Sequence, residues 1–213
     1  YTLDGTLRYS AGEVVDTITT GEDGTAQSQP LYLGKFQVKE IQFPHGMVDT
    51  GENVTNVELV YAGQEVEVTE TSASFYNQRQ KALVTLNKVL EQDETFGIGM
   101  NGEISAVTFG LYAQEDITAA DGSVIPADGL LEIVSVNENG QAVCSTDLPF
   151  GSFYLKELST DNHYLLNGET FPFTFEYGGP SIAVVEISAN DGEAVTNELI
   201  RGEIKGLKTD ENG

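Results

Sequence analysis

The segment LPFGSFYLKE, residues 148–157, occurs a second time in altered form as LYLGKFQVKE, residues 31–40. Both copies place a glycine before an alternation of apolar and polar residues, and both end in Lys–Glu. Alternation with a period of two is typical of a β-strand with one buried face. A strand motif that recurs along one chain indicates that the chain is built from copies of one all-β unit.

The similarity extends to both sides of this motif. The further matching segments are Asp4–Gly5 with Asp121–Gly122, Asp23–Gly–Thr–Ala26 with Asn139–Gly–Gln–Ala142, Phe75–Tyr–Asn77 with Val195–Thr–Asn197, and Val84–Thr–Leu–Asn–Lys88 with Ile204–Lys–Gly–Leu–Lys208. We therefore predict three parts: residues 1–80 are a unit that lacks its first strands, 81–200 are a complete unit, and 201–213 are the first strand of a third repeat. The first unit's counterpart of Ala82–Tyr112 would lie before Tyr1, so we interpret the chain as a fragment of a larger secreted protein.

Short segments rich in Val, Ile, Thr, Tyr and Phe recur between turns that contain Gly, Asp and Asn. This spacing predicts an antiparallel all-β sandwich, and we expect tandem Greek-key β-sandwich units of the immunoglobulin-like or prealbumin-like kind. A short helical turn is expected around Thr118–Ala120. The predicted strands include Asn56–Tyr61, Glu65–Thr71, Ala82–Leu90, Ala106–Tyr112, Phe171–Tyr177, Ile182–Ser188 and Gly202–Lys208.

The charge of the chain excludes several classes of partner. Asp and Glu number 34 against 10 Lys and Arg among 213 residues, a formal net charge of −24. A nucleic-acid binder needs a basic face, and so does a protein that adsorbs to an anionic membrane leaflet. No apolar run is long enough to span a bilayer. The single cysteine, Cys144, excludes an intrachain disulfide, and its alternating surroundings predict a buried thiol.

Polar residues stand at positions where the strand pattern predicts an inward side chain. Lys88 shares a face with Val84 and Leu86, Glu157 shares one with Phe153, and Asn197 shares one with Val195. The first copy repeats two of these positions with Glu40 and Asn77. A buried Lys, Glu or Asn costs several kcal/mol unless it is paired, so we expect these residues to meet one another.

A lysine, a glutamate and an asparagine are the groups needed to form an amide bond. In a dry core, desolvation lowers the pKa of a lysine and raises that of a glutamate. The neutral amine is then a nucleophile toward the carboxamide carbon, and the protonated carboxyl shuttles protons while ammonia leaves. Proximity inside the fold supplies the effective concentration.

At these residues the sequence resembles the SpaA-type and collagen-adhesin B-type (prealbumin-like) domains of Gram-positive pilins and adhesins. The resemblance is carried by VTFGLY (107–112), DLPFGSFYLKE (147–157) and EAVTN (193–197), and it covers nearly the whole chain in two copies. It implies a Greek-key β-sandwich, a place on the bacterial cell wall or surface, and a spontaneous Lys–Asn isopeptide bond assisted by the motif glutamate.

Carried over to this chain, the resemblance implies a cross-link between Lys88 and Asn197 with Glu157 as its catalyst. Glu40 and Asn77 match the same positions in the first unit, where the lysine strand is absent, and Lys208 matches in the third. We therefore expect stalk repeats that contact neighbouring domains of the same protein. Head-to-tail complementation, in which the tail of one chain pairs with the first unit of the next, is a further expectation.

Other chemistry is disfavoured by the motifs that the sequence lacks. The nucleophile elbow, the P-loop and the dinucleotide-binding glycine pattern are absent, so we predict self-cross-linking and not enzymatic turnover. His45 and His163 stand in predicted loops without metal-ligand spacing, and the acidic turns lack a full calcium-loop series, so no metal or cofactor is expected. The alternatives are a ligand-binding sandwich for a host glycan or matrix protein, with Tyr76 and Tyr154 as candidate contacts, and an accessory domain of a secreted hydrolase.

Overall fold

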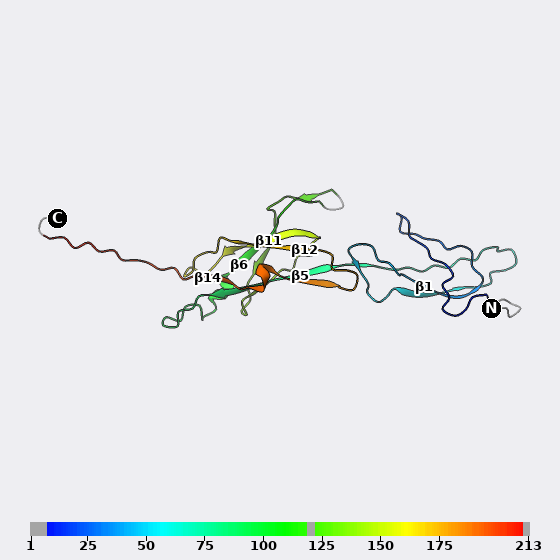
Figure 1. The fold of residues 1–213 in the computed structure, drawn as a ribbon, viewed down its shortest axis with the longest axis horizontal. Helices are drawn as coiled ribbons and strands as arrows, with labels where there is room; N and C mark the ends of the chain where they lie inside the picture. Colours follow the sequence, from blue (N-terminus) through cyan, green and yellow to red (C-terminus); the bar gives the residue numbers. More distant parts are fainter. Residues whose placement is uncertain (1–7, 119–121, 211–213) are drawn as a thin grey trace. The chain divides into compact units, whose positions relative to one another are not determined.

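The computed structural model describes residues 8–118 and 122–210 and consists almost entirely of β-strands (Figure 1). The all-β prediction is therefore confirmed. The chain divides into two units, residues 1–78 and 79–213. This division falls two residues before the predicted joint after Gln80, and a third repeat that begins at residue 201 stays a prediction.

The second unit is a sandwich, and β5 (Lys81–Leu90) is the central strand of its first sheet. This strand pairs antiparallel with β10 (Gln141–Val143) and parallel with β13 (Val184–Ser188) and β14 (Val195–Asn197). One strand thus supplies the hydrogen-bonding partner for three others. The parallel pairing places the first and last strands of the unit side by side.

The second sheet runs in the order β12 (Thr170–Phe175), β11 (Gly151–Ser159), β6 (Thr108–Ala113) and β9 (Leu130–Ser135), with antiparallel pairs throughout. A small hairpin of β7 (Ile117–Thr118) and β8 (Val124–Ile125) stands outside this sheet. Two 3₁₀ turns, η1 (Glu103–Ala106) and η2 (Ala189–Gly192), complete the unit.

The core lies between the two sheets of the second unit, where alternate residues of each strand point inward. Along β5 the residues Val84, Leu86, Lys88 and Leu90 are buried while their neighbours are more exposed. Each fully buried Leu or Phe contributes about 1.5–3 kcal/mol relative to an exposed one. The largest fully buried hydrophobic residues include Phe109, Phe153, Phe175, Leu86, Leu111, Leu148 and Leu155.

In the first unit the main ladder is a hairpin of β1 (Gly34–Lys39) and β3 (Val54–Leu59). The strands β2 (Met47–Val48) and β4 (Gln78–Arg79) have two residues each, and β4 begins at the last residue of this unit. Among the described residues of this unit, 8–33 and 60–77 form no strand. The predicted strand Glu65–Thr71 is therefore wrong for this structure. In the predicted repeat its counterpart is β13, which pairs with β5, and the described residues of the first unit form no strand that takes the place of β5.

The C-terminal residues 201–210 are exposed and extend from the second unit (Figure 1). The predicted strand Gly202–Lys208 does not form in this structure. A strand needs a hydrogen-bonded partner strand, and this segment pairs with no other segment of the described structure. The predicted helical turn begins at Thr118, which lies in β7, and its other two residues lie outside the described range, as do Asp4, Gly5 and Asp121 of the predicted turns.

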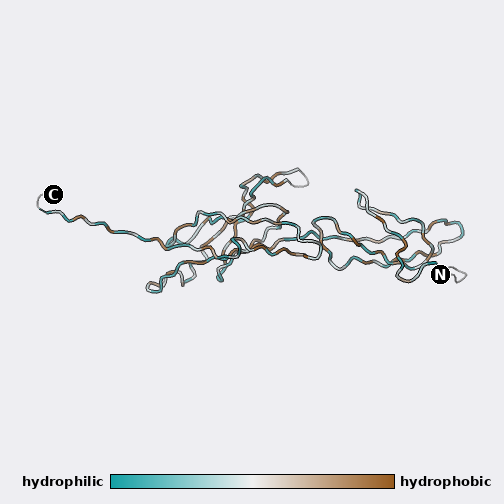
Figure 2. Tube along the Cα trace, viewed as in Figure 1, coloured by the Kyte–Doolittle hydropathy of each residue, from teal (hydrophilic) through white to brown (hydrophobic). Residues whose placement is uncertain are grey.

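Hydropathy changes repeatedly along the trace, without a long hydrophobic run (Figure 2). Within the described parts of the chain, no helix is long and apolar enough to cross a membrane.

Candidate functional site

Lys88 is the buried lysine of β5, and the residue is 3% exposed between the sheets. Its Nζ donates to the Asn197 side-chain oxygen and to the backbone oxygens of Val195 (3.0 Å) and Val89 (3.3 Å). Each of these acceptors lies on β5 or on β14. The amine is therefore surrounded by oxygens that compensate for its removal from water.

Asn197 reaches the same point from β14. The parallel register pairs Val195 with Lys88 and Asn197 with Leu90, so both side chains point into the core from one sheet. The Asn197 Nδ2 donates to the Glu157 Oε2 at 3.0 Å and to the Leu165 carbonyl oxygen at 2.9 Å. The two hydrogen bonds orient the carboxamide so that its oxygen faces Lys88.

Glu157 comes from β11 in the opposite sheet and is 1% exposed. Its Oε1 lies 3.8 Å from the Lys88 Nζ and, within the described residues, has no hydrogen-bond partner. Its Oε2 accepts from Asn197 and also from the backbone N–H of Asn167, at 2.6 Å. The structure thus brings Lys88, Glu157 and Asn197 together, with one carboxylate oxygen beside each of the other two side chains.

Burial lowers the pKa of Lys88 to about 8, and the nearby Glu157 carboxylate partly offsets this effect. An amine with that pKa is neutral about one time in ten at pH 7. Burial thus favours the neutral amine, which is the form in which a lysine acts as a nucleophile.

In the first unit, Glu40 and Asn77 also meet. The Asn77 Nδ2 donates to the Glu40 Oε1 at 2.8 Å, and both side chains are half-buried. Lys35 and Lys39 are exposed and alternate with the inward residues of β1. Lys208 lies in the exposed tail. The first unit therefore has a matching Glu–Asn pair without an inward lysine on its described strands.

The end of the second unit holds an ion pair that the sequence analysis did not single out. The carboxylate of Glu91, one residue beyond β5, accepts hydrogen bonds from both terminal nitrogens of Arg201 (2.7 and 3.1 Å) and from the backbone N–H of Leu199 (2.8 Å). The Arg201 hydrogen bond is the main cause that lowers the pKa of Glu91 to about 2, followed by the Leu199 N–H. In sequence the pair is visible only as the spacings Lys88–x–x–Glu91 and Asn197–x–x–x–Arg201, which do not distinguish a bound pair from two solvated charges.

Sequence reasoning also missed the contacts made by backbone groups and by one buried amide. The carbonyl of Leu165 and the N–H of Asn167 carry no side-chain signal. Gln80 is fully buried, and its amide bonds to the backbone of Gly178, Gly179 and Ile182.

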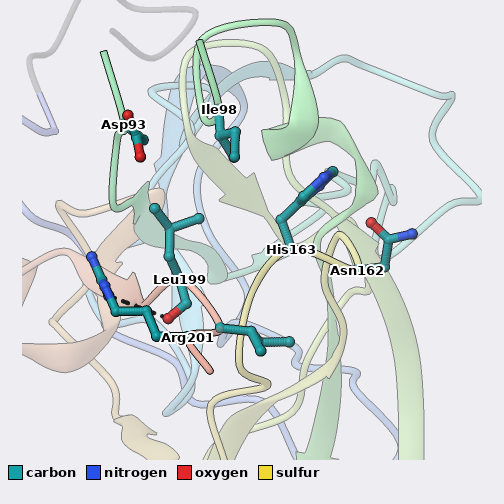
Figure 3. Close-up of a pocket in the computed structure, with 7 residues that line it drawn as sticks. Asp93, Ile98, Asn162, His163, Leu199 and Arg201 are labelled. Atoms are coloured by element: carbon teal, nitrogen blue, oxygen red, sulfur yellow. Dashed lines mark hydrogen bonds between the residues drawn. The ribbon is translucent and has the colours of Figure 1, made fainter. Parts of the chain in front are cut away.

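A shallow surface pocket lies beside the ion pair (Figure 3). Of its polar residues, Arg201 is engaged by Glu91, and His163 bonds through Nδ1 to Asp161 at 2.6 Å. In the described ranges no three His, Cys, Asp or Glu residues are grouped to hold a metal ion. The lining residues are Asp93, Ile98, Asn162, His163, Leu199, Ile200 and Arg201.

The two candidate ligand-contact tyrosines differ in environment. Tyr154 stacks on Tyr112 across β11 and β6, with ring centroids 5.1 Å apart, and donates to an Asp128 carboxylate oxygen at 2.9 Å. Tyr76 is 82% exposed. Cross-strand packing accounts for Tyr154 without a ligand.

A two-sheet sandwich whose first and last strands pair in parallel over a buried Lys–Glu–Asn group is a prealbumin-like architecture. The family model for the SpaA prealbumin-like fold domain matches residues 3–74 and 98–189. The chain belongs to this family, as the sequence resemblance predicts.

Among solved structures, the Bacillus anthracis TIE protein is similar over 86% of this chain and 28% of its own, at 23% identity and a TM-score of 0.52. The T6 backbone pilin of Streptococcus pyogenes serotype M6 matches 45% of this chain and 16% of its own, at 26% identity and a TM-score of 0.29. BcpA, the major pilin subunit of Bacillus cereus, matches 55% of this chain and 29% of its own, at 16% identity and a TM-score of 0.31.

The chain thus spans less than a third of each of these three proteins. No curated protein matches it.

Proposed function

We propose that the chain consists of structural repeats from the stalk of a Gram-positive adhesin or pilus-like protein, held on the cell surface. Membership of the SpaA prealbumin-like family supports this role. The acidic surface, with a net charge of −24, also suits a protein that must stay soluble and repel other copies outside the cell.

We propose further that the second unit cross-links itself between Lys88 and Asn197. The observation that carries this proposal is the meeting of Lys88, Glu157 and Asn197 in the core, each at most 3% exposed. A buried ionisable pair is weak evidence for stability by itself, since apolar residues fill a core at lower cost. Its arrangement around a carboxamide carbon is what a condensation requires.

The bond changes balance as follows. A proton passes from the Lys88 ammonium to Glu157, and the neutral Nζ attacks Cγ of Asn197. The Cγ–Nδ2 bond breaks as Nδ2 takes the carboxyl proton, and a second proton leaves the former amine through Glu157. The products are one amide bond, one ammonium ion and a regenerated carboxylate, so neither an oxidant nor a cofactor is consumed.

The two oxygens of Glu157 suit these two transfers. Oε1 is the oxygen nearest to Lys88 and has no other partner within the described structure, so it is free to accept the amine proton. Oε2 already receives the Nδ2–H of Asn197, so it is placed to return a proton to the leaving nitrogen.

The test is the intact mass of the purified chain. The wild-type protein should be lighter than its sequence mass by one ammonia, and tandem mass spectrometry should join the peptides of Lys88 and Asn197. Lys88→Ala and Asn197→Ala should retain the full mass. Lys156→Ala, which removes an exposed lysine of β11, is the matched control and should lose ammonia like the wild type. A full-mass wild-type protein after complete folding would refute the cross-link.

For partners, we propose neighbouring domains of the same protein, with head-to-tail strand complementation between copies of the chain. The preformed Glu40–Asn77 pair and the exposed tail that carries Lys208 support it. A denaturing gel of the chain at high concentration should show a ladder that Lys208→Ala abolishes. Monomer alone on this gel would refute covalent linkage, and monomer in native sizing as well would refute complementation.

A further inference from the structure

The strand that brings Asn197 to Lys88 is short, and its ladder alone specifies its position weakly. β14 has three residues and pairs with the long strand β5 along one side. A slip by one residue would turn Asn197 out of the core, and a slip by two would move it about 7 Å along the strand. A cross-link between these strands therefore needs something that holds their register before the bond exists.

Besides backbone bonds from His163 and Leu165 to residues 198 and 200, several contacts that hold this register involve Glu91, three residues after Lys88. Its backbone N–H donates to the carbonyl of Asn197 at 3.0 Å, and its own carbonyl accepts the Tyr164 hydroxyl at 2.8 Å. Its carboxylate accepts from Leu199 and, through both oxygens, from Arg201. Glu91 thus contacts Asn197, Leu199 and Arg201.

We propose that Glu91 and Arg201 form a positioning latch that sets the register of β14 on β5 so that Asn197 meets Lys88. This inference rests on the proposed cross-link and adds two residues to it. Neither residue touches the reacting atoms, so both act through the placement of the strand. A forked carboxylate–guanidinium pair suits this task because it is directional as well as attractive.

The chain repeats the charges of this latch at matching places in its sequence. The first copy has Asn77–x–x–x–Lys81, with a cation at the same distance from its asparagine as Arg201 has from Asn197. The third copy has Lys208–x–x–Glu211, which matches Lys88–x–x–Glu91 in sequence. Each incomplete copy thus carries one of the two latch charges at the spacing that it has in the second unit.

The latch and an ordinary surface ion pair predict different results. A latch is needed until the covalent bond fixes the strands, so its loss slows bond formation but changes the finished protein little. Because Glu91 and Arg201 are partly exposed, salt screens their attraction. The rate of bond formation in the wild type should therefore fall as salt is added, while a chain without the latch should be insensitive to salt.

The experiment follows ammonia loss in chains that are kept unreacted in urea and then refolded by dilution, with intact mass measured over time. Glu91→Gln keeps the side-chain shape and one oxygen acceptor but removes the charge. It should form the bond roughly five-fold more slowly at low salt, and the difference should vanish at about 1 M salt. Arg201→Lys, which keeps the charge but loses the fork, should be intermediate. Glu94→Gln removes the same charge from an exposed neighbour and should react like the wild type.

The outcomes separate the latch from the cross-link itself. A wild-type chain that never loses ammonia would refute the cross-link and the latch with it. A wild-type chain that reacts, alongside Glu91→Gln and Arg201→Lys chains that react equally fast at every salt concentration, would refute the latch alone. If the Glu91→Gln chain, once fully cross-linked, melts at the same temperature as the wild type, the result supports a latch. A markedly lower melting temperature of that cross-linked chain would indicate a purely structural ion pair.

Discussion

The two units share one hairpin and differ in almost everything around it. In the first unit Gly34 pairs with Leu59 and Lys39 with Val54; in the second, Gly151 pairs with Phe175 and Lys156 with Thr170. The register is the same in both. Beyond the hairpin, the second unit has two four-stranded sheets, whereas residues 8–33 and 60–77 of the first form no strand.

This difference shows which strand organises the domain. The strands β10, β13 and β14 all pair with β5, and β9 pairs with β6. By the predicted repeat, the described residues 8–78 would hold the counterparts of the paired strands but not those of β5 and β6. The hairpin survives because its two strands satisfy each other's backbone groups, while the remaining segments lack the partner that would make them strands.

The largest effect is expected from the glutamate of the complete unit. Glu157→Ala should abolish ammonia loss and leave Lys88 buried without its carboxylate. Loss of a cross-link between residues 109 positions apart, together with the unpaired amine, should lower the free energy of unfolding by roughly 5–8 kcal/mol. Glu40→Ala removes one half-buried hydrogen bond and should cost about 1 kcal/mol, and this variant should still lose one ammonia like the wild type. Calorimetry with intact mass compares the two, and equal effects would contradict the contrast between the units.

Supplying the organising strands should convert the first unit into a copy of the second. We predict that residues 81–117 placed before Tyr1 add partners for the unpaired segments, so that a second ammonia is lost at Asn77. Hydrogen exchange should slow for residues 60–77, because their amides gain ladder bonds. Lys88→Ala within the added copy should prevent the second loss while keeping the protection. Unchanged exchange would mean that β5 and β6 are not what the first unit lacks.

Two matching glycines offer a finer comparison. Gly24 and Gly140 both adopt a positive φ, +76° and +75°, but a Cβ on Gly24 would meet nothing within 4 Å while one on Gly140 would lie 2.5 Å from the Lys88 carbonyl oxygen. Gly24→Ala should cost about 1 kcal/mol from the backbone strain. Gly140→Ala should cost roughly 2–4 kcal/mol, because β5 must also move. Denaturant unfolding of the two variants checks the order, and a reversed order would contradict the structure around β5.

The smallest effect concerns pH, and it belongs to the second unit alone. The reactive form, with a neutral amine and a protonated carboxyl, holds as many protons as the Lys88–Glu157 ion pair. The rate of ammonia loss on refolding should therefore be level just below pH 8, over the range in which the pair holds one titratable proton. It should fall by about ten-fold per unit above pH 8, where the pair loses its last shared proton. A rate that rises through pH 8 and then levels would show that the amine reacts beside an ionised Glu157.

Much of this molecule could be predicted from strand parity. The inward positions of Lys88, Glu157 and Asn197 follow from alternation, since neighbouring side chains of a strand point to opposite faces. Glu65–Thr71 shows where that reasoning ends: its pattern is as strand-like as that of β13, but a strand also needs a partner. The Glu91–Arg201 pair was missed because the sequence around a charged residue past a strand end is the same whether that residue is solvated or forms an ion pair.

The sequence alone was sufficient for the all-β class, the family and the inward positions of Lys88, Glu157 and Asn197, because each depends on local alternation or on similarity between segments. The tertiary structure decided what depends on the meeting of distant segments: that β14 lies parallel to β5, that Glu157 reaches across from the other sheet, and that Asn167 and Leu165 orient the site through their backbones. These contacts join residues far apart in the chain, and backbone donors and acceptors are the same for every residue type except proline, so no local pattern encodes them.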